Sequence, residues 1–326
     1  MKASRLIFEN HGKPLEKIQF EDFILPSLQD GEVLISINAA PINPADLNYI
    51  EGTYGIKPEL PATGGIECAG TVIDSKSSDF IEGDMVIPLK KVGGWASHAI
   101  TTADNLIKLP SDIDPRQASM LKVNPATAWL LLQHFEKLVE GDTVVLNASN
   151  SGVGQCVIQV AASLGIRTIC FLRNLSLEQE LLNLGASIVL PDSAEGLDQA
   201  RSEYGKAPAS LAFNAVGGDS ALRLLKLLKT GGTHITYGAM GLKPLTIPNG
   251  PLIFGDLRIR GLWVTKWMDS ASPQDLKRVY DQLAEQVTNG SLIQKIDSTF
   301  KLSNFKEALL RLNADGRDGK ILFKNT

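Results

Sequence analysis

The stretch that decides the fold runs from Thr143 to Arg173 and reads TVVLNASNSGVGQCVIQVAASLGIRTICFLR. It opens on a short apolar, β-branched run of the kind that forms a buried parallel strand. A small polar turn follows, and within Val153–Leu164 the apolar residues then take helical spacing. Thr168–Leu172 is predicted to be a second strand. The stretch therefore predicts a β-turn-α-β unit, with Gly152 and Gly154 where the turn meets the helix.

Gly152 and Gly154 have a physical reason to stand there. A diphosphate reaches the free N–H groups and the positive dipole end of a helix only where no side chain blocks the approach. Asn147 and Ala148 occupy the places of an earlier glycine, so the full G-x-G-x-x-G pattern is not present. Such a loop is either a tight structural turn or a dinucleotide site, and the strand–turn–helix–strand context favours the dinucleotide site.

The end of the second strand indicates which dinucleotide is preferred. An NAD site places Asp or Glu there to bind the ribose 2′-hydroxyl. This chain instead has Arg173 and Asn174, with no acidic residue before Glu178. A guanidinium binds a 2′-phosphate through paired, charged hydrogen bonds, whereas a carboxylate repels it. Arg173 therefore favours NADP(H); the alternative is a solvent-facing arginine in a loop.

Length and composition predict an ordinary α/β protein of two domains. The chain has 326 residues and a net charge of -4, with no basic stripe that would indicate nucleic acid binding. No apolar run is long enough to span a bilayer, so we expect no membrane partner. The first residues enter strand-like alternation at once and resemble neither a signal peptide nor a transit peptide. We therefore expect a cytoplasmic protein, or one of the mitochondrial matrix if a presequence has been removed.

Cysteines and histidines give no sign of a disulfide framework or a metal site. The three cysteines, Cys68, Cys156 and Cys170, are scattered in apolar contexts, as buried free thiols would be. The four histidines show no paired spacing with one another or with a cysteine. We therefore predict that no metal is bound.

The first 120 residues are predicted to be mostly β, as in a partly open barrel. A loop rich in Pro and Gly, Pro41–Gly65, interrupts them, and long irregular loops are often functional. Within it, Asn43 could cap a helical turn that begins at Pro44. Tyr54 lies further along; its hydroxyl could serve a developing oxyanion or simply pack under the loop. The predicted strands are Ala3–Phe8, Glu32–Ala40, Glu67–Ile73, Met85–Pro88, Trp95–Thr101 and Asn105–Lys108.

Residues 143–265 alternate strand and helix, which predicts parallel pairing with helices on both faces of a sheet. A last strand of this region is predicted at Leu257–Val264. Parallel sheets bind ligands beyond the carboxyl ends of their strands. We therefore expect four residues that follow predicted strands to converge on one dinucleotide: Asn150, Arg173, Tyr237 and Gly238.

Several motifs together resemble the zinc-independent medium-chain dehydrogenase/reductase superfamily, and within it the trans-2-enoyl-thioester reductases of the mitochondrial fatty-acid-synthesis type. The resemblance covers nearly the whole chain. It implies a GroES-like catalytic domain over residues 1–121, an NADPH-binding Rossmann domain over 122–289 and a return to the catalytic domain over 290–326. The motifs that carry it are Asn43–Asp46, Gly64–Gly70, Glu82–Asp84, the Pro41–Gly65 loop, Val123–Ala128, Asn147–Gln155, Asn214–Gly218 and Trp263–Trp267.

The resemblance also implies an activity and a set of site residues. NADPH would deliver hydride to the β-carbon of a trans-2-enoyl thioester, and Tyr54 would orient or protonate the enolate. Asn43 and Trp263 would contact the substrate. The pattern around Lys320 is shifted by about a residue from that of the family. In the zinc-dependent relatives, the places held here by Pro41–Asn43 and Ile66 carry metal ligands. The cofactor contacts implied are Asn124, Asn150, Ser151, Gly152, Val153, Arg173, Asn174, Tyr237, Gly238, Met240, Trp263, Thr265 and Lys320.

The partners implied are an enoyl-CoA or an enoyl-acyl carrier protein, and a second copy of the chain. Homodimers of the family often form through edge strands that resemble Leu257–Trp263. Two other functions stay open. One is an NADPH quinone or enone oxidoreductase on the same scaffold, and the other is a non-catalytic, crystallin-like NADPH-binding protein. The acceptor that is reduced would discriminate among the three.

Overall fold

The stretch quoted above folds as predicted in the computed structural model, which describes residues 1–325. It forms strand β9 (Thr143–Leu146), helix α5 (Gly152–Ser163) and strand β10 (Arg167–Leu172). These elements belong to the unit Asn124–Ser272. Its other elements are α4 (Asn124–Gln133), η2 (Leu175–Leu177), α6 (Glu178–Asn183), β11 (Ile188–Pro191), α7 (Ala194–Tyr204), β12 (Ala209–Asn214), α8 (Gly218–Leu225), β13 (Leu228–Thr236), α9 (Asn249–Phe254), β14 (Arg258–Gly261) and α10 (Val264–Ser270).

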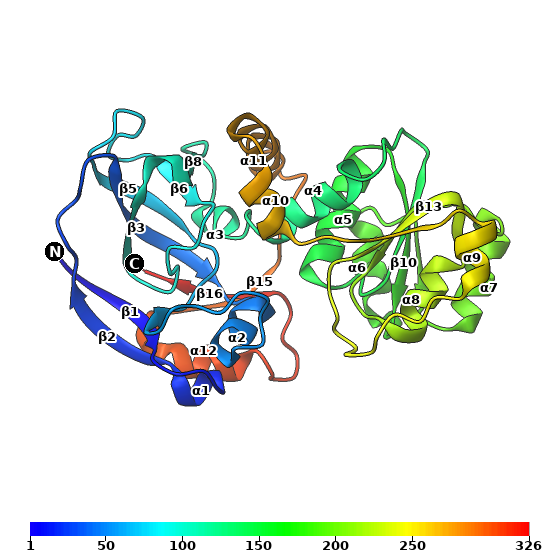
Figure 1. The fold of residues 1–326 in the computed structure, drawn as a ribbon, viewed down its shortest axis with the longest axis horizontal. Coiled ribbons are helices and arrows are strands. Elements are labelled where there is room, and N and C mark those ends of the chain that lie inside the picture. The colour runs from blue at the N-terminus through cyan, green and yellow to red at the C-terminus, as the bar shows by residue number, and fades with distance from the viewer. Residues whose placement is uncertain (326) are drawn as a thin grey trace. The chain divides into compact units, whose positions relative to one another are not determined.

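One six-stranded sheet, in the order β11-β10-β9-β12-β13-β14, organises this unit. Every adjacent pair of strands is parallel, and helices flank the sheet (Figure 1). A parallel sheet whose strands are joined through helices is the doubly wound arrangement. The predicted Rossmann-type domain is therefore confirmed. Strand order also makes β10, β9, β12 and β13 neighbours, so their carboxyl ends lie along one edge of the sheet.

The other unit comprises Met1–Val123 and Pro273–Thr326. It contains the N-terminal residues and is called the first unit; Asn124–Ser272 is the second unit. Its seven-stranded sheet has the order β15-β16-β3-β5-β6-β8, with β7 paired to β3, and its three-stranded sheet has the order β2-β1-β4. The elements are β1 (Lys2–Phe8), α1 (Pro14–Lys17), β2 (Gln19–Ile24), β3 (Glu32–Pro41), α2 (Pro44–Glu51), β4 (Ala62–Thr63), β5 (Ala69–Ser75), β6 (Met85–Pro88), β7 (His98–Thr102), η1 (Ala103–Asn105), β8 (Leu106–Lys108), α3 (Pro115–Ala118), α11 (Pro273–Thr288), β15 (Ile296–Phe300), η3 (Leu302–Asn304), α12 (Phe305–Arg311) and β16 (Lys320–Lys324).

Trp95 fills the centre of the core of this unit. It is fully buried, packs edge-on against Phe323 at a centroid distance of 5.3 Å, and donates from its indole N–H to the carbonyl of Pro41. A Cβ at Gly64 would lie 2.3 Å from the indole ring, and one at Gly65 only 2.4 Å from the Trp95 nitrogen. Only glycine fits at these two positions. The Gly-Gly pair therefore lets the end of the Pro41–Gly65 loop lie directly on Trp95.

Helix α11 belongs to the first unit. The sequence-based prediction instead placed it in the Rossmann domain, which was expected to end at residue 289. Its buried face includes Tyr280, whose hydroxyl donates to the carbonyl of Lys122 at 3.2 Å. The helix also packs against α3. The two units therefore divide at Val123 and Pro273.

Three strands and the end of a fourth differ from the sequence-based prediction. Strands β2, β4 and β15 were not predicted. The predicted strand at Leu257–Val264 is wrong at its end, because β14 stops at Gly261 and α10 begins at Val264. Val264 and Met268, one helical turn apart, are buried, and α10 packs on α4. Burial of this i, i+4 pair outweighs the β-propensity of the segment. No helix within residues 1–325 combines the length and apolar character that a bilayer span requires.

Candidate active site

The turn between β9 and α5 is built around Ser151. Its hydroxyl caps α5 by accepting a hydrogen bond from the backbone N–H of Gly154 at 3.1 Å. A Cβ at Gly154 would lie 2.5 Å from the carbonyl oxygen of Ser149, so this glycine is required by the turn itself rather than by a ligand's approach. Ala148 has a φ of 47°, in the left-handed region that glycine adopts without strain. It stands where the full G-x-G-x-x-G pattern would have an earlier glycine. Asn150 is exposed, and Gly152 and Val153 begin the helix.

Two buried asparagines at neighbouring strand ends hold this turn in place. The Nδ2 group of Asn147 donates to Oδ1 of Asn214 at 2.9 Å and to the hydroxyl of Ser220 at 2.8 Å. Oδ1 of Asn147 accepts from the N–H of Ala215 at 2.8 Å. All the polar atoms of this amide are therefore used. From the sequence, Asn147 belongs to the Asn147–Gln155 motif and is a departure from the glycine pattern, but it was not predicted that its side chain joins two strand ends.

Arg173 follows β10 directly and is exposed. Within residues 1–325 its guanidinium makes no hydrogen bond or ion pair, which leaves five N–H donors for a ligand. Asn174 has a local task, since its Oδ1 accepts from the N–H of Ser176 at 3.0 Å and caps η2. This edge of the sheet therefore offers an uncommitted positive charge.

Tyr237 lies at the end of β13, and its N–H donates to the carbonyl of Asn214 at 3.0 Å. Its hydroxyl is buried and makes no hydrogen bond of normal geometry among the described residues. Burial raises the pKa of this hydroxyl, and the nearby Ser151 side chain partly opposes that shift. A buried hydroxyl beside the cap of α5 costs free energy until a ligand pairs with it. Gly238 follows, and Met240 is exposed.

The remaining expected cofactor residues of this unit start two helices. Asn124 is the first residue of α4 and is buried. Trp263 precedes α10 and is 38% exposed, and Thr265 is half-buried in the first turn. Trp263 and Thr265 thus lie at the beginning of a helix, not at the end of a strand.

In the first unit, Tyr54 follows the left-handed Gly52 that ends α2. Its backbone N–H donates to the carbonyl of Asn48 at 3.1 Å, and its ring packs, partly buried, on the core of this unit. The helix before it begins at Pro44, as predicted. Asn43 is the N-cap of this helix, as predicted. Asp46 completes a capping box, because its carboxylate reaches back and accepts from the N–H of Asn43 at 2.8 Å.

The Asn43 side chain joins a buried polar network. Its Nδ2 group donates to Oε1 of Glu67 at 2.8 Å, and its Oδ1 accepts from the ammonium group of Lys320. Oε2 of Glu67 accepts from the N–H of Val123 at 2.9 Å. Lys122 donates to the carbonyl of Ile66 at 2.8 Å. The structure thus brings two expected site residues, Asn43 and Lys320, together around a glutamate that sequence reasoning did not select.

Asp46 and Lys91 add a second pair of charges to this region. Asp46 is buried, and its Oδ1 also accepts from the N–H of Ile66 at 2.7 Å. Burial raises the pKa of Asp46 to about 7. Burial lowers the pKa of Lys91 to about 8, and its ammonium lies 3.4 Å from the centroid of the Tyr49 ring. Both groups therefore exchange protons close to neutral pH.

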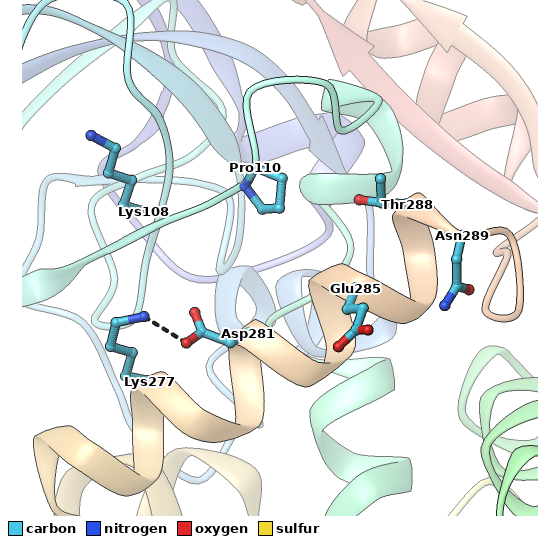
Figure 2. A pocket seen from close by; sticks show the side chains of 7 residues that line it. All are labelled: Lys108, Pro110, Lys277, Asp281, Glu285, Thr288 and Asn289. Atoms are coloured by element: carbon cyan, nitrogen blue, oxygen red, sulfur yellow. Dashed lines mark hydrogen bonds and ion pairs between the residues drawn. The ribbon is translucent and has the colours of Figure 1, made fainter.

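A groove of about 490 Å³ runs along α11 in the same unit (Figure 2). Figure 2 shows an ion pair between Lys277 and Asp281 on the helix, with Pro110 opposite. None of the predicted site residues lines this groove, whose seven lining residues are Lys108, Pro110, Lys277, Asp281, Glu285, Thr288 and Asn289.

Comparison with known proteins decides the family. The model described as alcohol dehydrogenase GroES-like domain matches residues 29–111, and the model described as zinc-binding dehydrogenase matches residues 152–285. The mitochondrial enoyl-[acyl-carrier-protein] reductase of Rattus norvegicus is 40% identical over 312 residues, which are 93% of this chain and 84% of the rat protein. The chain belongs to the family of the mitochondrial enoyl-[acyl-carrier-protein] reductases.

Solved structures of similar proteins share the whole fold. The structure of the Etr1p/NADP/crotonyl-CoA complex superposes with a TM-score of 0.89 at 27% identity and covers 100% of both chains. The mitochondrial 2-enoyl thioester reductase Etr1p/Etr2p heterodimer from Candida tropicalis gives the same TM-score, 0.89, at 27% identity over 100% of both chains. The family resemblance seen in the sequence motifs is therefore confirmed.

Two expectations from the sequence concern the cysteines and the absence of a metal. Cys68, Cys156 and Cys170 are buried and free, as predicted. Among residues 1–325, no group of three or more His, Cys, Asp or Glu side chains could hold a metal ion. The predicted absence of a metal stays a prediction.

Proposed function

We propose that this chain reduces the α,β double bond of trans-2-enoyl thioesters with NADPH. The observation that carries the proposal is its relationship, over nearly its whole length, to enoyl-[acyl-carrier-protein] reductases and to the Etr1p/NADP/crotonyl-CoA complex. In this assignment the unit Asn124–Ser272 binds the cofactor, and the unit formed by Met1–Val123 and Pro273–Thr326 carries the catalytic groups.

The residues of the second unit fit NADPH. Arg173 offers an uncommitted guanidinium for a 2′-phosphate, and the Ser151-capped end of α5 offers N–H donors and a positive dipole for a diphosphate. The buried, unpaired hydroxyl of Tyr237 provides a further donor beside that cap. The other proposed contacts of this unit are Asn124, Asn150, Gly152, Val153, Asn174, Gly238, Met240, Trp263 and Thr265. Lys320, from the first unit, is proposed as a further contact.

NADPH supplies the hydride that reaches the β-carbon of the enoyl group. Negative charge then develops on the thioester oxygen and the α-carbon, and this charge needs a donor. Tyr54 is the proposed donor, because it lies on the predicted functional loop and carries a phenol O–H group. Asn43 and Trp263 are proposed to contact the acyl chain.

The test is a steady-state assay of the purified chain with NADPH and two acceptors. Oxidation of NADPH with crotonyl-CoA, at a kcat/KM well above that with a quinone, is the expected result. A preference for the quinone would establish the alternative oxidoreductase. Tight NADPH binding without turnover of either acceptor would leave the crystallin-like, non-catalytic alternative.

The same type of assay, with crotonyl-CoA and crotonyl-acyl carrier protein as the two acceptors, tests which carrier of the acyl group is preferred. Crotonyl-CoA and crotonyl-acyl carrier protein carry the same phosphopantetheine arm and differ only in what lies beyond it. We expect the chain to reduce both, since its relatives are named for the acyl carrier protein and the similar Etr1p structure is a complex with crotonyl-CoA. A kcat/KM with one carrier at least about tenfold above the other would name the preferred substrate.

The chain is also proposed to form a homodimer through β14. This strand lies at the edge of its sheet, and Ile253 and Phe254 just before it are 68% and 86% exposed. An open edge beside exposed apolar side chains is a ready interface. Analytical ultracentrifugation should give a dimer for the wild type and a monomer for Phe254→Asp. A monomeric wild type would refute the proposal.

The compartment is part of the same proposal. Buried free thiols suit any reducing compartment, and both the cytosol and the mitochondrial matrix are reducing. We propose the cytoplasm for this chain; its curated relatives are named mitochondrial. Fractionation of cells that express the tagged protein distinguishes the two, and recovery with mitochondria would overturn the cytoplasmic assignment.

A further inference from the structure

Glu67 is a buried carboxylate with both oxygens committed. It is 1% exposed. Oε1 accepts from the side-chain amide of Asn43 at 2.8 Å, and Oε2 accepts from the backbone N–H of Val123 at 2.9 Å. Val123 ends the first of the two chain segments of its unit and directly precedes Asn124, a proposed cofactor contact. One side chain therefore connects the start of the functional loop with the chain segment that leads into α4.

Glu67 also decides which way the Asn43 amide faces. An ionised carboxylate only accepts hydrogen bonds, so it must face the NH₂ group of Asn43. The amide oxygen is then turned to the other side, where it accepts from the ammonium group of Lys320. The orientation of Asn43, and with it the acceptor that fixes Lys320, follows from the charge state of Glu67.

Burial raises the pKa of Glu67 above its ordinary value, and the ammonium of Lys320, the Asn43 and Val123 hydrogen bonds and the ammonium of Lys122 oppose that rise. The ionised state is supported by the geometry, because each carboxylate oxygen accepts a hydrogen bond. A buried acid that is so surrounded contributes more than packing, because removal of one partner leaves the others unpaired.

We propose that Glu67 is a positioning residue of enoyl thioester reduction: through Asn43 it fixes the ammonium group of Lys320, and through Val123 it fixes the entry to Asn124. This inference rests on the proposed function of the site. In this proposal, Glu67 itself touches neither substrate nor cofactor. Its effect reaches the reaction through a proposed substrate contact, Asn43, and a proposed cofactor contact, Lys320.

Hydrogen-bond chemistry provides a sharp substitution. In Glu67→Gln the new amide can keep the bond from Val123 only by turning its own NH₂ group towards the NH₂ group of Asn43. Rotation of Asn43 would then point its NH₂ group at the Lys320 ammonium. No arrangement satisfies all four groups. In the pair Glu67→Gln with Asn43→Asp, by contrast, Asp accepts from both Gln and Lys320, and every bond is restored.

The experiment is a double-mutant cycle on Glu67→Gln and Asn43→Asp, with exposed Glu307→Gln as the matched control. For each protein, kcat and KM are measured with NADPH and crotonyl-CoA, and the thermal midpoint is recorded. Each single substitution is expected to lower kcat/KM about tenfold or more. The double variant should recover to within a few-fold of wild type, and the control should match wild type.

Two results would overturn the proposal. One is additive loss in the double variant. The other is a Glu67→Gln protein with lower stability but wild-type kcat/KM, which indicates a purely structural role. If Glu67→Gln does not fold, the double variant is compared with Asn43→Asp alone, and a kcat/KM no higher than that of Asn43→Asp overturns the proposal. A wild type that does not reduce crotonyl-CoA refutes the proposed function instead, and the same cycle is then read from NADPH affinity by fluorescence.

Discussion

Asn43 and Lys320 are hydrogen-bonded partners although 277 positions separate them in the sequence. The contact exists because β16, which begins at Lys320, pairs antiparallel with the end of β3, two residues before Asn43. Glu67 lies on the other side of the same amide. The C-terminal strand is thus part of the proposed catalytic unit.

Lys320→Met is expected to lower the free energy of unfolding by about 1–3 kcal/mol, because it leaves an amide acceptor unpaired and removes a positive charge that acts on the buried Glu67. Lys324→Met, on the exposed end of the same strand, is the control and should change stability little. Urea denaturation measures both. Equal effects of the two substitutions would contradict the importance of the contact with Asn43.

Tyr54→Phe removes only a hydroxyl and is expected to lower kcat about 10²-fold, with little change in the KM for NADPH, if this hydroxyl serves the enolate. The ring keeps its packing on the core, so the thermal midpoint should stay within a degree or so of wild type. Tyr204→Phe, in α7 of the other unit, is the control. An unchanged kcat with crotonyl-CoA would reduce Tyr54 to a packing residue.

Arg173→Ala is expected to raise the KM for NADPH about 10–100-fold and to leave the KM for NADH unchanged, because charged hydrogen bonds to a 2′-phosphate are worth about 1.5–3 kcal/mol. The side chain is exposed and has no ion pair among the described residues, so stability should not change. Arg278→Ala, an exposed arginine of α11, controls for the loss of one positive charge. Survival of the NADPH preference in Arg173→Ala would exclude this arginine as the phosphate contact.

The parallel sheet could be predicted because buried strands such as β9 and β10 carry their own apolar, partly β-branched runs. Strand β2 could not, because it is an edge strand with charged residues and alternating partial exposure. Strand β15 is likewise only partly buried. Pairing with neighbours, rather than local sequence, makes both of them strands.

The residues of the candidate site also divide into those that local sequence indicates and those that only the folded structure reveals. Tyr54 and Arg173 could be proposed from the sequence because the features that distinguish them are local: one lies in an unusual loop, the other directly after a strand. Glu67 could not, because its partners Asn43, Val123 and Lys320 come from segments that only the folded sheet brings together. A lone buried glutamate has no sequence pattern that separates it from a surface one.

His234 should make the second unit sensitive to acid. It is 1% exposed in β13, its Nδ1 atom makes no hydrogen bond among residues 1–325, and burial lowers its pKa to about 4. The unfolded chain, with a histidine pKa near 6.5, therefore takes up the proton first. The contribution of neutral His234 to stability is complete above about pH 6.5 and is lost as pH falls towards 4, by up to about 3 kcal/mol.

The measurement for His234 is the free energy of unfolding of wild type and of His234→Gln between pH 7.5 and about pH 4.5. The difference between the two proteins cancels other titrating groups, including Asp46, whose raised pKa acts in the opposite direction. Wild type should lose stability relative to the variant as pH falls. A difference that stays constant over this range would show that His234 is not the titrating group.

Ala148→Gly is expected to stabilise the protein, which is unusual for a glycine substitution. Ala148 has a φ of 47° in the turn before α5, and the left-handed region costs a residue with a Cβ about 1–2 kcal/mol. Glycine avoids that cost but loses about 0.5–1 kcal/mol of chain entropy, so the net gain should be about 0.5–1 kcal/mol.

Ala148→Val should be destabilising, because a β-branched side chain is still less tolerated there. Ala162→Gly, at an exposed position inside α5, is the control and should lose about 1 kcal/mol. If urea denaturation gave Ala148→Gly the same loss as Ala162→Gly, the turn would not hold Ala148 under strain, and the missing first glycine of the pattern would have no cost in this fold.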